Sequence, residues 1–190
     1  MWILALSLTP LVLMRTPWSV RRTVLAGIAG FAGMVLETIL ILHYQTKNGI
    51  LFQDIGILLT GFMAGLAAGA FAVTRIKHLL SRRLGIFLLL AFAALSAAIG
   101  LEISSGSDAG LLEILGLLAL TGCLVAGTFA YASLRAVSDQ GSVVAPLYAA
   151  DLIGGCIGSI LASLALAPLA GLVWTAYLLI PIALLSILLL

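Results

Sequence analysis

Between residues 50 and 74 the sequence reads ILFQDIGILLTGFMAGLAAGAFAVT. A helix needs about 20 mostly apolar residues to cross a bilayer, and this stretch is long enough. It is also too long and too continuously apolar for the alternating pattern of a barrel strand. Gly61, Gly65 and Gly69 recur at every fourth position, a doubled GxxxG that lets two helix backbones approach closely. The stretch therefore predicts a transmembrane helix that packs through a glycine face.

Five further runs have the same length and apolar character, and together with Ile50–Thr74 they predict six long spanning helices. They are Thr23–His43, Gly85–Ile103, Gly110–Leu134, Val143–Ala167 and Gly171–Leu190. Since lipid leaves only helices or closed barrels as spanning structures, we expect an all-α fold. The predicted architecture is a polytopic transmembrane helix bundle that forms a single domain over residues 1–190.

The run Met1–Met14 is shorter than the others, since fourteen helical residues reach only about 21 Å. A signal peptide carries its positive charges before the apolar stretch, whereas in this chain Arg15, Arg21 and Arg22 follow it. We therefore favour a short or tilted N-terminal helix, with the remnant of a helix from a longer parent protein as the alternative. The apolar end at Leu190 also suggests a parent chain that continues.

The composition leaves little material for a water-facing surface. The chain is 63% hydrophobic and 8% charged, against about 25% charged residues in soluble domains. The net charge of +2 is small, and the basic residues form short clusters between apolar runs, which argues against nucleic-acid binding. Cys123 and Cys156 lie inside apolar runs without zinc or haem spacing. We expect a lipid-embedded protein with no metal and no cofactor.

The basic residues alternate between loops in a way that predicts topology. The loops 15–22, 75–84 and 135–142 hold eight Lys and Arg residues, while Lys47 is alone in the alternate loops. Because cytoplasmic loops carry the excess of Lys and Arg, we expect the first set in the cytoplasm. The chain is expected to cross its membrane several times.

Small residues follow one face of three predicted helices. These faces are expected to pack helix against helix, because glycine permits close backbone contact in lipid. The predicted packing residues are Gly30, Gly33, Gly61, Gly65, Gly69, Gly154 and Gly158.

Three carboxylates share those small-residue faces. Glu37 follows Gly33 by four positions, Asp54 precedes Gly61 by seven, and Asp151 precedes Gly154 by three. A charge that faces lipid at a helix centre costs roughly 2.5–3.5 kcal/mol, so we expect these acids to point into the bundle. The sequence places no Lys or Arg inside a predicted helix to pair with them. They are candidate cation or proton sites, with a carboxyl that hydrogen-bonds a neighbouring helix as the alternative.

Four stretches carry a resemblance to a known family. They are Gly30-Phe-Ala-Gly-Met-Val-Leu-Glu37, Gly61-Phe-Met-Ala-Gly-Leu-Ala-Ala-Gly69, Tyr148-Ala-Ala-Asp-Leu-Ile-Gly-Gly-Cys-Ile-Gly158 and Leu166-Ala-Pro-Leu-Ala-Gly171. In order and separation they resemble the membrane module of bacterial spermidine-synthase-like multi-pass proteins. The resemblance implies that the chain lies in the bacterial inner (cytoplasmic) membrane. The resemblance adds Tyr148 to the candidate cation or proton sites. The sequence departs from the family pattern at Phe129-Ala130, where the family usually has Phe-Pro.

The resemblance covers roughly residues 23–171 and leaves out the family's aminopropyltransferase domain, which no loop of this chain is long enough to contain. We therefore expect no enzyme activity. The expected function is that of a transporter-like module for a polyamine or another cation. The alternative is a non-catalytic structural subunit or scaffold of a larger membrane complex, with electron transfer as one variant. Expected partners are the lipid bilayer, a separate aminopropyltransferase-like protein or other membrane subunits.

Overall fold

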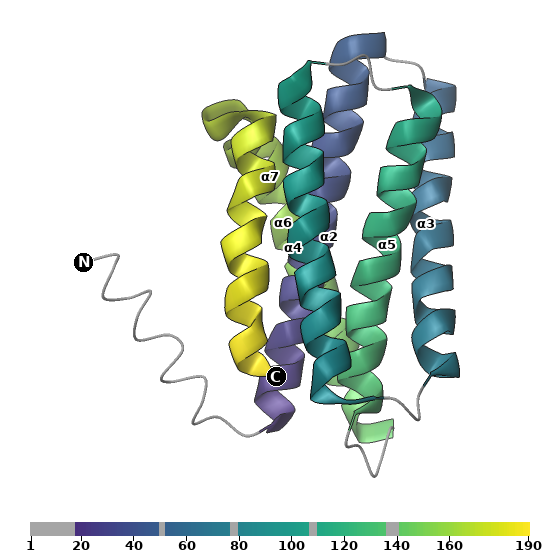
Figure 1. The fold of residues 1–190 in the computed structure, drawn as a ribbon, viewed down its shortest axis with the longest axis vertical. Helices are drawn as coiled ribbons and strands as arrows, with labels where there is room; N and C mark the ends of the chain where they lie inside the picture. The colour runs from purple at the N-terminus through teal and green to yellow at the C-terminus, as the bar shows by residue number, and fades with distance from the viewer. Residues whose placement is uncertain (1–17, 50–51, 77–79, 107–109, 136–140) are drawn as a thin grey trace, which may run out of the picture.

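A computed structural model describes residues 18–49, 52–76, 80–106, 110–135 and 141–190, and within these residues the chain is helical without strands (Figure 1). The predicted short helix 1–14 lies outside the described residues. The elements in chain order are α2 (Trp18–Asn48), α3 (Phe52–Arg75), α4 (Arg82–Ser105), α5 (Leu111–Leu134), α6 (Gly141–Leu161), the π-helical turn η2 (Ala162–Leu166), α7 (Ala167–Ser186) and the final turn η3 (Ile187–Leu189).

Five helical runs of the described chain are long and apolar enough to cross a membrane, as expected of a multi-pass membrane protein. The expectation of six long helices plus a short one is not matched. The reason lies between residues 144 and 189, where the two last predicted helices follow each other without a loop and count as one run of 46 residues with a kink at Gly171. That run would extend about 69 Å if straight, more than twice the hydrocarbon core.

The long run folds back on itself at Gly171. This residue has φ 84° and ψ 165°, a conformation open essentially to glycine, and it interrupts the helical dihedrals. Leu147, near the start of α6, and Leu189, near the chain end, belong to the same buried cluster, so both ends of the run meet. Figure 1 shows α6 and α7 joined at the upper end of the view, with the C-terminus at the lower end.

A π-helical turn precedes the reversal. Pro168 lacks an N–H, and its ring clashes with the carbonyl four residues earlier in a regular α-helix. The widened turn Ala162–Leu166 accommodates this, and the N–H of Ala167 donates to the carbonyl of Ala162, five residues back. The tight reversal thus combines a proline that disfavours the α-helix with a glycine that can leave it.

Glycine contacts join the helices into two close pairs. On α3, Gly65 and Gly69 lie against the backbone of Ala119 and Cys123 on α5. On α6, Gly154 and Gly158 lie against the backbone of Gly27 and Phe31 on α2. All seven predicted packing glycines have a neighbouring helix within van der Waals range of the Cβ position; their partners are Asp151, Val125, Leu115, Ala119, Cys123, Gly27 and Phe31. We refer to these units as the α3–α5 pair and the α2–α6 pair.

The basic residues gather at one end of the bundle, which we call the basic end. Arg21 donates from Nη2 to the carbonyl oxygen of Leu188 at 2.8 Å, which ties the start of α2 to the chain end. The guanidinium of Arg135 lies 4.7 Å from the ring centroid of Trp18 and donates to the Tyr131 hydroxyl. Arg21 and Arg22 lie within α2, not in the loop 15–22 that we expected. At the other end, Lys47 donates to the carbonyl of Gly106.

Candidate functional site

A cleft opens where the two close helix pairs meet. It has a volume of about 490 Å³ and is lined by residues of α2, α3, α5 and α6. Ligand pockets usually measure about 300–1,000 Å³, so the cleft has room for a small organic molecule. Its walls come from α3 on one side and α6 on the other, and these helices pack closely on different partners, α5 and α2. The cleft is therefore a consequence of how the two pairs are joined.

Asp151 lies in this cleft on α6, ten residues after the helix begins at Gly141. At 1.5 Å per residue that is about 15 Å from the basic end, close to the middle of a 30 Å hydrocarbon core. Its Oδ1 atom is buried against Gly30, where an added Cβ would lie only 2.6 Å away. Within the described chain, Oδ1 has no hydrogen-bond partner.

The surroundings of Asp151 explain why the sequence brings it to this position. Gly30 and Gly33 of α2 and Gly155 of α6 also line the cleft, and small residues at these positions allow the carboxylate to sit between two helix backbones. The position agrees with the prediction that this acid follows a glycine face. Whether it binds a cation or a proton stays a prediction.

Glu37 is the most deeply buried of the candidate acids, with 5% of its surface exposed. It lies on α2, and its Oε2 atom is buried without a hydrogen-bond partner among the described residues. The cleft that contains Asp151 does not include Glu37. Its side chain is directed into the bundle, as expected, but the described cleft gives it no route to a ligand.

Asp54 lies near the end of the bundle opposite the basic end and has a clear structural partner. The Tyr44 hydroxyl donates to its Oδ2 atom at 2.6 Å, which links the last turns of α2 to the first turn of α3. This arrangement matches the alternative stated for the acids, a carboxyl that hydrogen-bonds a neighbouring helix. Asp54 does not line the cleft.

Tyr148 lies on α6 three residues before Asp151, and 56% of its surface is exposed. It does not line the cleft. The structure thus brings Asp151 together with glycines, and it leaves Glu37, Asp54 and Tyr148 at separate places.

Several lining residues are not singled out by the sequence patterns. The thioethers of Met34 and Met63, the Cys156 thiol and the Ser159 hydroxyl all line the cleft with Asp151. For Ser159 a signal exists, because it follows Asp151 by eight residues, about two helical turns, on the same face. For Met63 the sequence gives no such signal. Met63 lies on α3, and α3 comes near α6 only because the α3–α5 pair packs against the α2–α6 pair.

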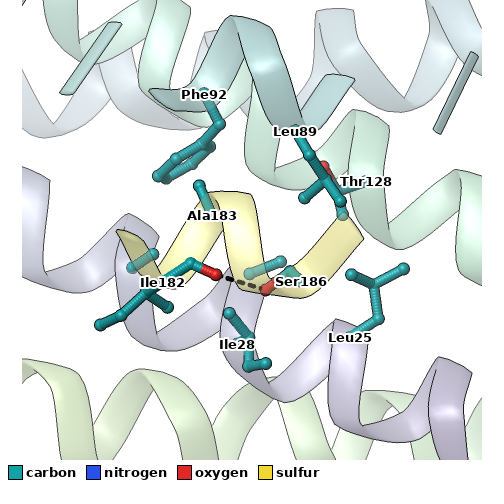
Figure 2. A pocket seen from close by; sticks show the side chains of 10 residues that line it. Leu25, Ile28, Leu89, Phe92, Thr128, Ile182, Ala183 and Ser186 are labelled. Atoms are coloured by element: carbon teal, nitrogen blue, oxygen red, sulfur yellow. Dashed lines mark hydrogen bonds between the residues drawn. The ribbon is translucent and has the colours of Figure 1, made fainter. Parts of the chain in front are cut away.

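A second void shows what ordinary packing gaps look like in this bundle. Figure 2 shows it between α2, α4, α5 and α7, with Leu25, Phe92 and Ser186 among its lining residues. Its volume is about 10 Å³, roughly the space of one water, and the Ser186 hydroxyl donates to the carbonyl of Ile182 in its own helix. The Asp151 cleft is therefore far larger than a packing defect.

Within the described part of the chain, no group of three or more His, Cys, Asp or Glu residues could hold a metal ion. No family model matches the chain, and neither does any curated protein or solved structure.

Proposed function

We propose that this chain is a multi-pass membrane transporter module for an organic cation, with Asp151 as the group that binds the cation. One observation carries the proposal: a carboxylate with an unpartnered oxygen lies at mid-depth in a cleft of about 490 Å³. Ionisable groups inside membrane helices are rare and commonly mark substrate or ion pathways.

The physical argument concerns the charge of Asp151. Asp151 is half-buried, and its Oδ1 atom is buried without a hydrogen-bond donor among the described residues, which makes the charged form costly. The cost falls when a cation or a proton occupies the cleft. A cleft that is lined by this acid therefore favours the binding of a cation and disfavours the binding of an anion.

The helix packing supplies a way to move. Glycine contacts hold each pair closely, so a rearrangement would leave the α3–α5 and α2–α6 pairs intact and change the angle between them. The cleft lies at that junction, where Gly33 of α2 meets Val125 of α5. A bound cation would then become accessible from alternate sides of the bilayer, the general scheme of secondary transporters.

The resemblance to spermidine-synthase-like membrane modules supports a polyamine as one candidate cation and a separate aminopropyltransferase-like protein as a partner. It also supports the bacterial inner membrane as the location, with the basic end in the cytoplasm. A reporter enzyme active only outside the cytoplasm, inserted at Gly106, should be active, whereas the same reporter inserted beside Arg83 should be inactive. The reverse pattern would contradict the orientation.

Uptake into proteoliposomes tests the transport proposal. Purified protein reconstituted into vesicles should accumulate labelled spermidine or a labelled organic monocation above the level of empty vesicles. The Asp151→Asn variant should lose most of this uptake, because the amide keeps the size of the side chain and removes its charge. Glu113→Gln is the matched control, since Glu113 lies exposed in the first turn of α5, outside the cleft. Equal uptake by the two variants would contradict the role of Asp151.

A scaffold subunit of a larger membrane complex is the second candidate function. It is favoured by the low burial of two elements. In their most apolar stretches, 28% of the residues of α3 and 33% of those of the run Val144–Leu189 are buried inside the bundle, against 61% for α2. Large apolar side chains such as Phe71 and Leu164 are exposed on these elements and could contact another subunit instead of lipid. Purification in mild detergent tests it: stoichiometric partner chains would support the scaffold, and a lone monomer would contradict it.

A further inference from the structure

We propose that the occupant of the Asp151 cleft is an amphiphilic monocation, a single ammonium or phosphonium charge on a bulky apolar body, that enters sideways from the lipid. This inference rests on the proposed function and narrows its substrate class. It follows from three properties of the cleft: its charge, its lining and the direction in which it opens.

The charge of the lining matches one positive group. Among the described residues that line the cleft, Asp151 is the only charged one, and the remaining polar side chains are the Ser159 hydroxyl and the Cys156 thiol. A polyamine carries several ammonium groups spaced along its chain, and the described lining offers no carboxylate to the additional ones. An uncompensated charge at this depth is unfavourable, so the cleft selects against polycations.

The rest of the lining is apolar and adaptable. Phe62 and Leu66 of α3 line the cleft together with Leu152 and Ile160 of α6, and Met34 contributes a thioether from α2. Thioether side chains are flexible and polarizable, which suits apolar ligands of varied shape. From Asp151 to Ile160 the α6 wall rises about 13 Å, so an apolar group has contact surface well beyond the carboxylate.

The cleft opens toward the acyl chains. Its rim carries Met63 on α3 and Leu152 and Ile160 on α6, whose side chains are 61%, 50% and 56% exposed. In a helix that is long and apolar enough to span, large apolar side chains that are exposed within the apolar stretch contact lipid tails. A ligand that dissolves in the bilayer can therefore reach Asp151 without crossing a polar vestibule.

Glu37 serves as an internal contrast. It is also buried without a hydrogen-bond partner for its Oε2 atom in the described chain, yet it lies outside this cleft. A bulky ligand that occupies the cleft has access to Asp151 and none to Glu37. The two acids are thus separable by experiment.

The test is equilibrium binding of radiolabelled tetraphenylphosphonium to the purified full chain in nanodiscs of zwitterionic lipid, with empty nanodiscs subtracted and spermidine as competitor. Asp151→Asn should weaken tetraphenylphosphonium binding by at least about tenfold, because it removes the counter-ion of a buried charge pair. Glu113→Gln and Glu37→Gln should bind as the unchanged protein does. Spermidine should not displace the probe at concentrations far above that of the probe.

A second pair of variants tests the shape of the cleft and does not depend on the carboxylate. Met63→Trp fills the opening between α3 and α6 and should weaken binding of the bulky probe. Phe87→Trp places the same side chain at an exposed position of α4, outside the cleft, and should leave binding unchanged. Unaltered elution and helical content would show that each variant is folded.

The outcomes separate the two proposals. Displacement of the probe by spermidine, even at concentrations far above that of the probe, or binding that is unaffected by Asp151→Asn, would overturn the monocation inference and leave cation transport standing if uptake occurs. Absence of both binding and uptake for both cations would overturn the inference and the proposed function together.

Discussion

Replacing Gly65 by alanine should separate the α3–α5 pair. A Cβ added at Gly65 would lie 2.7 Å from the carbonyl carbon and 2.9 Å from the Cα of Ala119, both backbone atoms. Ordinary contact begins at 3.4 Å, and the carbonyl oxygen of Ala119 lies closer still to the added Cβ, so α3 would have to withdraw by well over about 0.7 Å. The backbone of α5 cannot rotate away as a side chain can. We expect overpacking of this kind to lower the free energy of unfolding by about 2 kcal/mol.

The matched control is Gly56→Ala on the same helix, where an added Cβ meets no described atom within 4 Å. Both substitutions add one methyl group to α3 and remove one glycine from it, so they have the same effect on helix propensity, and only the interhelical contact differs. Unfolding of both variants in mixed detergent micelles, followed by circular dichroism, measures the difference. Gly56→Ala should be neutral or slightly stabilising. Equal free energies of unfolding for the two variants would refute the assignment of Gly65 to a backbone contact.

Three further changes have defined expectations in the same unfolding assay. Asp151→Asn should leave the stability unchanged or raise it by up to about 1 kcal/mol, because Oδ1 is buried without a donor in the described chain; a marked loss would show that the carboxylate is structural. Tyr44→Phe should lower the stability by about 1–2 kcal/mol by removing the hydrogen bond to Asp54, and a neutral result would show that this bond is absent in solution. Gly171→Ala should cost about 1–3 kcal/mol through its positive φ alone, whereas Gly110→Ala, at φ −71°, should cost little.

The candidate site is predictable from the sequence only in part. Position along the chain and the period of the helix are enough to place Asp151 on a glycine face, since both depend on local geometry alone. The same reasoning treats Glu37 and Asp54 as equivalent candidates, and the structure distinguishes the three. Asp54 has the Tyr44 hydroxyl as partner, Glu37 is enclosed, and Asp151 borders open space. A hydrogen bond or a cleft requires knowledge of which helices are neighbours, and periodicity does not contain it.

The helix count shows the same limit. The apolar runs at 143–167 and 171–190 are visible in the sequence and predict two separate helices. In the structure the helical hydrogen bonding continues through a π-helical turn, and the reversal occurs at one residue with positive φ. Whether α6 and α7 count as one helical run or as two helices therefore depends on the backbone dihedrals between Ala162 and Gly171.

The amino-acid sequence alone determined that this protein is helical and belongs in a membrane, because apolar length and the scarcity of charge act through the solvent and need no knowledge of contacts. It also determined which faces pack, because glycine spacing follows the helical repeat. Only the tertiary structure decided that α3 pairs with α5 and α2 with α6, and hence that a cleft with one carboxylate remains between the pairs. Such a choice is made by shape complementarity between helices distant in the chain, which is a property of the assembled bundle and of no single segment.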